Sequence, residues 1–165
     1  MAVLSTPFDL PAGRILALDL GRARIGVAVS DESGVLATPL TVVSRHPTRR
    51  QDFEALARLT ASERAAGILV GLPLGGQGEP GVQARWAQRY GGRLAGAVQV
   101  PVAFWDESYS TVDAARLLAE GGGRASVDAA AAAVFLGEFL EARRARGTSG
   151  QTRSSVEVEC ERSDV

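Results

Sequence analysis

The 165-residue sequence has no lysine, one cysteine, one histidine and only 5% aromatic residues. Because Cys160 stands alone, the chain can form neither a disulfide framework nor a thiolate metal site. No stretch approaches the roughly 18 consecutive apolar residues of a membrane-spanning helix, and residues 1–14 lack the apolar segment of a signal peptide. We therefore expect a cytoplasmic protein that has no contact with a membrane.

Overall charge gives no sign of a nucleic-acid partner, since the formal net charge is -1 and the isoelectric point is near 5.9. The composition, 45% hydrophobic and 22% charged, is typical of one globular domain. After Gly147 the sequence changes to serine, threonine, glycine and charged residues with an acidic excess. We predict a folded domain over residues 1–146 and a disordered acidic tail over 147–165.

Hydrophobic spacing predicts an α/β fold. Three strand-like segments come first, over 15–20, 24–30 and 35–43, and Pro39 favours an edge position for the third. Helical patterns over 49–66, 82–95, 111–120 and 126–146 then alternate with strands over 67–71 and 100–105. This order predicts a mixed five-stranded sheet, with three antiparallel strands followed by parallel strands, flanked by helices.

Acidic residues lie at the ends of two predicted parallel strands. Asp19 is near the end of the first strand, and Asp106 and Glu107 follow the fifth. The carboxyl ends of parallel strands meet at one edge of a sheet, so we expect these acids to converge there. A carboxylate that ends a buried strand costs free energy unless it is paired, hydrogen-bonded or metal-bound. A turn-forming Asp19 and a merely polar end of the fifth strand are the simpler alternatives.

The last predicted helix adds a third acid, Asp128. It shares a helical stripe with Ala132, Phe135 and Phe139, so we expect it to face the sheet. Three carboxylates without histidine or cysteine suit Mg²⁺ or Mn²⁺, and two such ions promote phosphodiester hydrolysis. The alternative is a capping acid that only stabilises the helix N-terminus after Ser126.

Four segments in order resemble the YqgF/RuvX family of the RNase H-like superfamily. They are residues 18–28, 70–74, 106–114 and 127–132, and the resemblance extends from about residue 14 to about residue 140. Members of this family are described as pre-16S rRNA nucleases or as Holliday junction resolvases. The resemblance implies an RNase H-like fold and a catalytic, metal-binding site of Asp19, Glu107 and Asp128, which are the acids grouped above.

One departure from the family concerns the substrate. Ser108 follows the Asp-Glu pair, where the family usually has arginine. Arg22, Arg24 and Arg124 are candidates to supply the missing contact with the substrate.

A basic ridge on helix 82–95 includes Arg85 and Arg89 beside Trp86, and could bind a nucleic-acid backbone. A solvated surface is the alternative for these arginines, and for Trp86 we favour a half-buried packing role. Arg45, Arg49 and Arg50 form a second candidate phosphate patch, and we expect the neighbouring His46 to be an exposed bystander.

Three functions remain open at this point. The first is a metal-dependent endonuclease for structured nucleic acid, with pre-16S rRNA maturation preferred through the resemblance. Holliday junction cleavage in DNA recombination, which calls for a homodimer, is the alternative within it. The second is a nucleotide-binding domain of the actin, Hsp70 and sugar-kinase type. Such domains need two lobes that close on the nucleotide, and this chain is too short for two. The third is a catalytically silent nucleic-acid-binding module.

Overall fold

The computed structural model describes residues 2–73, 81–106 and 123–160, and it describes side chains in these ranges except at 123–126 and 148–160. The predicted helix over 111–120 lies outside the described residues. No helix in the described ranges is both long enough and apolar enough to cross a membrane.

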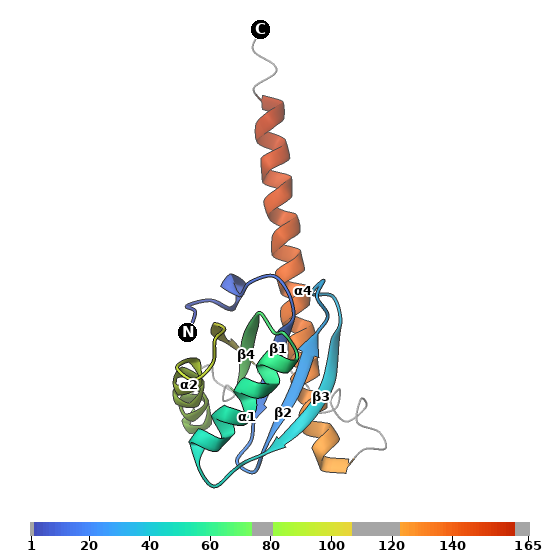
Figure 1. Cartoon of the computed structure of the whole chain (residues 1–165). Helices are drawn as coiled ribbons and strands as arrows, with labels where there is room; N and C mark the ends of the chain where they lie inside the picture. The colour runs from blue at the N-terminus through green and yellow to red at the C-terminus, as the bar shows by residue number, and fades with distance from the viewer. Residues whose placement is uncertain (1, 74–80, 107–122, 161–165) are drawn as a thin grey trace.

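Five strands form one sheet in the order β3-β2-β1-β4-β5 (Figure 1). They are β1 (Ile15–Leu20), β2 (Arg24–Ser30), β3 (Ala37–Ser44), β4 (Gly67–Leu72) and β5 (Val102–Asp106). β2 runs antiparallel to both β1 and β3, while β4 runs parallel to β1 and β5. The predicted mixed sheet is confirmed, and Pro39 lies in the edge strand β3.

Helices cover both faces of this sheet. α1 (Arg49–Ser62) and α2 (Val82–Ala95) pack on one face, where Leu56 and Leu94 are fully buried. α4 (Gly123–Cys160) crosses the other face (Figure 1). A short 3₁₀ helix, η1 (Pro7–Asp9), precedes β1. Two hydrophobic layers therefore enclose the sheet, and the strand ends lie between them.

Some boundaries differ from the prediction. α1 ends at Ser62 rather than at residue 66, because Arg64 has a φ of 53° and a left-handed residue cannot continue the helix. β3 and β5 each begin two residues later than predicted. The boundaries of β1, β2 and α2 agree with the prediction.

α4 is longer than the predicted helix over 126–146, since it begins at Gly123 and continues to Cys160. Ser126 therefore lies inside the helix. A capping acid would have to lie in the first turn, and Asp128 lies beyond it. Past Gly147 the helix continues to Cys160 and projects away from the sheet (Figure 1), while the disorder expected for residues 147–165 stays a prediction. No proline interrupts this segment, and each of its glycines costs only about 1 kcal/mol in a helix.

α4 lies very close to the sheet at Gly26 of β2. A side-chain carbon on Gly26 would collide with the backbone carbonyl of Asp128 and with the backbone nitrogen of Ala129. The predicted stripe of Ala132, Phe135 and Phe139 follows, and each of these side chains is 0% exposed. Because Gly26 has no side chain, the first turns of α4 lie directly on β2.

Gly26→Ala should destabilise the fold by about 2–3 kcal/mol, because the added methyl group must push α4 off the sheet. Gly92→Ala is the matched control, since this exposed α2 glycine has no atom within 4 Å of the added carbon. Alanine there should stabilise the protein by about 0.5–1 kcal/mol. Urea denaturation measures both free energies of unfolding, and equal effects of the two substitutions would contradict the close contact.

Candidate functional site

Asp19 and Asp128 lie on the same face of the sheet. Asp19 is the cross-strand partner of Gly26, and directly opposed residues of antiparallel strands point to the same side. Strand alternation agrees, since Ile15 and Ala17 of β1 pack in the layer beneath α4. The backbone of Asp128 lies over Gly26, so the two acids flank this glycine.

Arg24 holds the Asp128 side chain. Its Nε donates a hydrogen bond to Asp128 Oδ2 at 2.8 Å, and the two side chains are 39% and 29% exposed. Arg24 begins β2, two residues before Gly26, and therefore shares its face. The ion pair orients the Asp128 carboxylate near the end of β1, while a contact between Arg24 and substrate stays a prediction.

Asp106 ends β5 at the same edge of the sheet, with β4 between β5 and β1. It does not share the face of Asp19. Val102 and Phe104 of β5 pack beneath α1 and α2, whereas Ala103 and Trp105 pack beneath α4, so Asp106 points to the α2 side. Glu107 lies outside the described residues. Within the described ranges, no three acidic, histidine or cysteine side chains are grouped closely enough to hold a metal ion.

A buried carboxylate that sequence reasoning missed lies on the α2 side. Asp52 of α1 is 0% exposed, and it accepts hydrogen bonds from Arg45 Nε at 2.6 Å and from the backbone N–H of His46 at 2.7 Å. His46 Nδ1 also lies 3.0 Å from Asp52 Oδ1. Arg45 additionally donates to the Gly21 carbonyl at 3.1 Å. Asp52 therefore fixes Arg45, and Arg45 fixes the turn that follows Asp19.

Burial raises the pKa of Asp52, but the hydrogen bonds from His46 and Arg45 outweigh burial and leave the pKa below its ordinary value. Burial, with the nearby Asp52 charge, raises the pKa of Tyr90, which stays a neutral phenol.

Two arginines of the predicted phosphate patch at residues 45–50 are in ion pairs. The Arg45 charge is paired with Asp52, and Arg50 is paired with Glu54 at 3.1 Å. His46 is 40% exposed, as expected, and it also contacts Asp52.

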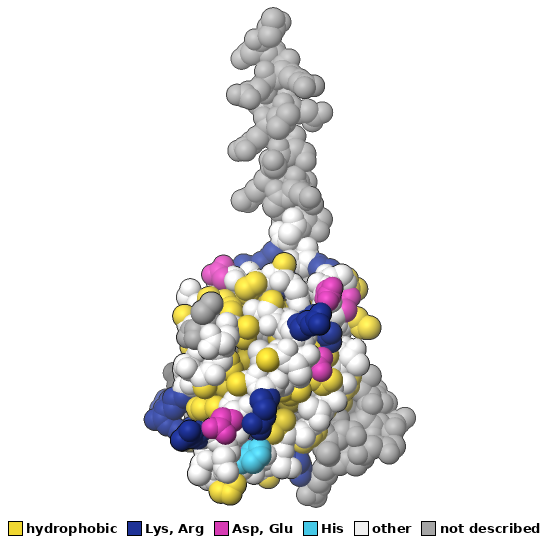
Figure 2. Space-filling view, in the orientation of Figure 1, with side chains coloured by type: hydrophobic (Ala, Val, Ile, Leu, Met, Phe, Trp, Pro, Cys, Tyr) yellow, Lys and Arg dark blue, Asp and Glu magenta, His cyan; other side chains and the backbone are white. Residues whose placement is uncertain are grey.

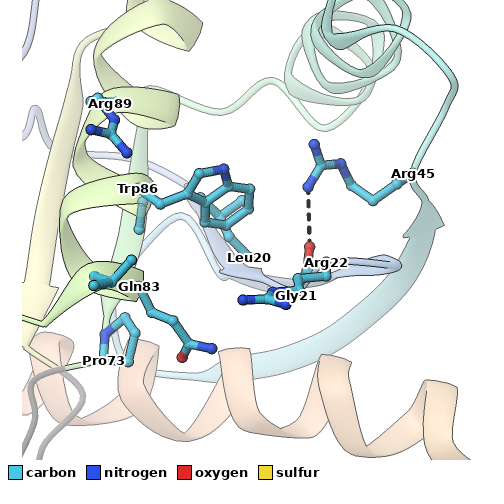
Figure 3. A pocket seen from close by; sticks show the side chains of 10 residues that line it. Leu20, Gly21, Arg22, Arg45, Pro73, Gln83, Trp86 and Arg89 are labelled. Atoms are coloured by element: carbon cyan, nitrogen blue, oxygen red, sulfur yellow. Dashed lines mark hydrogen bonds between the residues drawn. The ribbon is translucent and has the colours of Figure 1, made fainter.

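A cleft of about 540 Å³ lies beside this network (Figure 3). We call it the Trp86 cleft. Leu20 at the end of β1 lines one side, together with Gly21 and Arg22 of the β1–β2 turn. Gln83, Trp86 and Arg89 of α2 line the other side. Figure 3 shows Trp86 extending from α2 towards Leu20.

The predicted substrate-binding arginines are therefore separated in space. Arg22 and Arg89 are exposed and line the Trp86 cleft, whereas Arg24 pairs with Asp128 on the opposite face. Arg85 is exposed on α2 outside this cleft. The side chain of Arg124 is not among those described.

The fold matches a solved structure of a DNA-processing protein. Thermus thermophilus RuvC in complex with Holliday junction substrate superposes with a TM-score of 0.54 over 81% of this chain and 96% of that one, at 19% identity. A further structure of Thermus thermophilus RuvC gives a TM-score of 0.52. These similarities and the strand order define an RNase H-like fold.

The chain belongs to the RuvX family, described as Holliday junction resolvase, whose model matches residues 13–142. A protein of Anaeromyxobacter sp. (strain Fw109-5) is 44% identical over 137 residues, which cover 80% of this chain and 99% of its own. One from Chloroflexus aurantiacus is 39% identical over 135 residues, covering 79% and 88%. Both carry the name "Putative pre-16S rRNA nuclease".

Asp52→Asn should destabilise the protein by about 3 kcal/mol at neutral pH, because it leaves Arg45 partly buried without its anion. The lowered pKa of Asp52 means that its contribution is present above the ordinary carboxyl pKa and is lost as pH falls through the lowered one. The difference between wild type and variant should therefore shrink below about pH 4.

Urea denaturation between pH 3 and pH 7 measures this difference. Glu54→Gln is the control, since its exposed ion pair on the same helix should contribute less than about 0.5 kcal/mol. A pH-independent gap between wild type and Asp52→Asn would show that the Asp52 charge does not stabilise the fold.

Proposed function

We propose that the protein is a metal-dependent endonuclease that hydrolyses phosphodiester bonds in structured RNA, and that its substrate is precursor 16S rRNA. The observation that carries this proposal is the pair of carboxylates, Asp19 and Asp128, on one face at the carboxyl edge of β1. The names of the relatives support RNA as the substrate. We assign the activity to residues 1–146, which include the segment matched by the family, and we place the protein in the cytoplasm.

Carboxylate oxygens suit Mg²⁺ or Mn²⁺, and no described histidine or cysteine adjoins the two acids to favour a softer metal. Asp19 and Asp128 would hold the ion together with Glu107. The resemblance to the family implies Glu107, the residue after the end of β5, as the third ligand. When bound, such ions activate a water molecule and stabilise the leaving oxygen in phosphodiester hydrolysis.

The chain's own residues supply orientation and charge. The ion pair between Arg24 and one carboxylate oxygen of Asp128 restrains this side chain. The other carboxylate oxygen of Asp128 therefore keeps a fixed direction. The arginines proposed to contact phosphates of the substrate are Arg22, Arg24, Arg85, Arg89 and Arg124. Of these, Arg22, Arg24 or Arg124 would replace the arginine for which this chain has Ser108.

Cleavage of branched DNA is the second candidate function. It is favoured by the description of the RuvX family and by the fold shared with RuvC. A resolvase cuts two strands of a two-fold symmetric junction, so this function would require a homodimer.

Asp19→Asn and Asp128→Asn should each reduce cleavage by at least about 100-fold, because even residues that only orient metal ligands contribute 10–100-fold. The assay uses a labelled precursor rRNA fragment and a four-way DNA junction, each with Mn²⁺, Mg²⁺ or EDTA. Glu141→Gln is the control, since it neutralises an exposed carboxylate on the same helix as Asp128. It should retain wild-type activity.

The preferred substrate decides between the two candidate functions. Faster cleavage of the rRNA fragment supports RNA maturation, and faster cleavage of the junction by a dimer supports resolution. If the protein binds either substrate without cleaving it, and Asp19→Asn has the same affinity, the protein is a catalytically silent binding module.

A further inference from the structure

We propose that the Trp86 cleft binds one unpaired nucleotide of the RNA substrate, with the base stacked on Trp86 and the phosphate contacting Arg22 and Arg89. This inference rests on the proposed function, since it assigns a second contact to the same substrate. It concerns the face of the sheet opposite Asp19 and Asp128.

The charge of the cleft fits a phosphate. None of its described lining residues is acidic, and it contains three arginines. Arg45 is neutralised by Asp52, whereas Arg22 and Arg89 are exposed and form no ion pair with another described residue. Two exposed guanidinium groups without an ion-pair partner among the described residues therefore line the cleft, and guanidinium groups form strong charge-assisted hydrogen bonds with phosphate.

The aromatic surface of the cleft is held in position. Trp86 is half-buried and packs against Tyr90, with the ring centroids 5.6 Å apart. The Arg45 guanidinium lies 5.4 Å from the Trp86 centroid, and Asp52 fixes Arg45 in turn. A ring that is already ordered loses little entropy when a base stacks on it. The volume of about 540 Å³ lies within the range of small-ligand sites.

Basic residues continue along α2 from the cleft. A second cavity of about 130 Å³ shares Trp86 and Arg89 with the first and adds Arg49 and Arg93. On the face shown in Figure 2, arginine side chains gather around α2 and the start of α1, near the histidine. Neighbouring phosphates of the same strand would therefore also meet positive charge.

The position of the cleft links it to the acidic site. Gly21 and Arg22 of the β1–β2 turn lie two and three residues after Asp19, and Arg45 donates a hydrogen bond to the Gly21 carbonyl. A strand that crosses this edge of the sheet can place one phosphodiester at Asp19 and a nearby unpaired base on Trp86. The cleft would thereby select RNA in which the cleavage site adjoins an unpaired nucleotide.

Fluorescence anisotropy with a labelled single-stranded RNA in EDTA tests the cleft separately from cleavage. Trp86→Leu keeps an apolar side chain but removes stacking, so it should weaken binding about tenfold, and Trp86→Phe should restore most of the affinity. Neither variant should change affinity for an abasic strand of the same length. Circular dichroism and thermal unfolding confirm that each variant is folded.

The arginine variants should differ from the Trp86 variants in the salt dependence of binding. Arg22→Ala combined with Arg89→Ala should weaken binding and lower the slope of log affinity against log salt by about 0.7 if the two contact one phosphate. Trp86→Leu should leave that slope unchanged. Arg58→Ala is the control for loss of a positive charge outside the cleft, because Arg58 is exposed on α1 and lines neither cavity.

Equal affinity of wild type and Trp86→Leu for the RNA would overturn the inference, whether or not the wild type cleaves. Equal losses on the RNA and the abasic strand would overturn it as well. Loss of binding on Trp86→Leu in a protein whose cleavage is unaffected by Asp19→Asn would support the cleft while contradicting the proposed nuclease. A larger loss on single-stranded DNA than on RNA would overturn the assignment to RNA.

Discussion

The backbone contact between Gly26 and Asp128 is the constraint on which the candidate active site depends. A helix can lie this close to a strand only where the strand has no side chain. Small residues of α4 continue the close packing, since Ala129, Ala132 and Ala133 are all buried. The contact places Asp128 beside Asp19, although the two residues are more than 100 positions apart in the sequence. The Arg24 ion pair then orients the acid that the backbone has positioned.

The end of β1 and the turn that follows it contribute residues to both faces of the sheet. Asp19 points towards α4, while Leu20 and Gly21 line the Trp86 cleft on the α2 side. Asp52 stabilises this turn from a distance, because it holds Arg45, whose guanidinium binds the Gly21 carbonyl. A buried ion pair contributes little net stability by itself, but removal of one partner is costly. Its role here is to fix the geometry of a loop that adjoins the proposed active site.

Much of the fold could be predicted from the sequence, because β1 and α2 have clear hydrophobic patterns and the strand order follows from chain connectivity. Asp19 and Asp128 could be grouped because strand ends and helical stripes have defined directions. The face of Asp106 could not be predicted, because β5 has apolar residues on both faces and its sequence does not show which face packs beneath α4. The Asp52 network could not be predicted either, since it depends on how residues 45–48 fold back onto α1.

A crystal structure of the wild-type protein soaked in MnCl₂, with anomalous difference density measured above the manganese edge, tests the metal-dependent nuclease site most directly. The proposed site predicts a manganese peak bound by the carboxylates of Asp19 and Asp128, with Glu107 as a further ligand. The peak should be absent in Asp19→Asn. Well-ordered Asp19 and Asp128 side chains without manganese between them, at a concentration that supports catalysis, would contradict it.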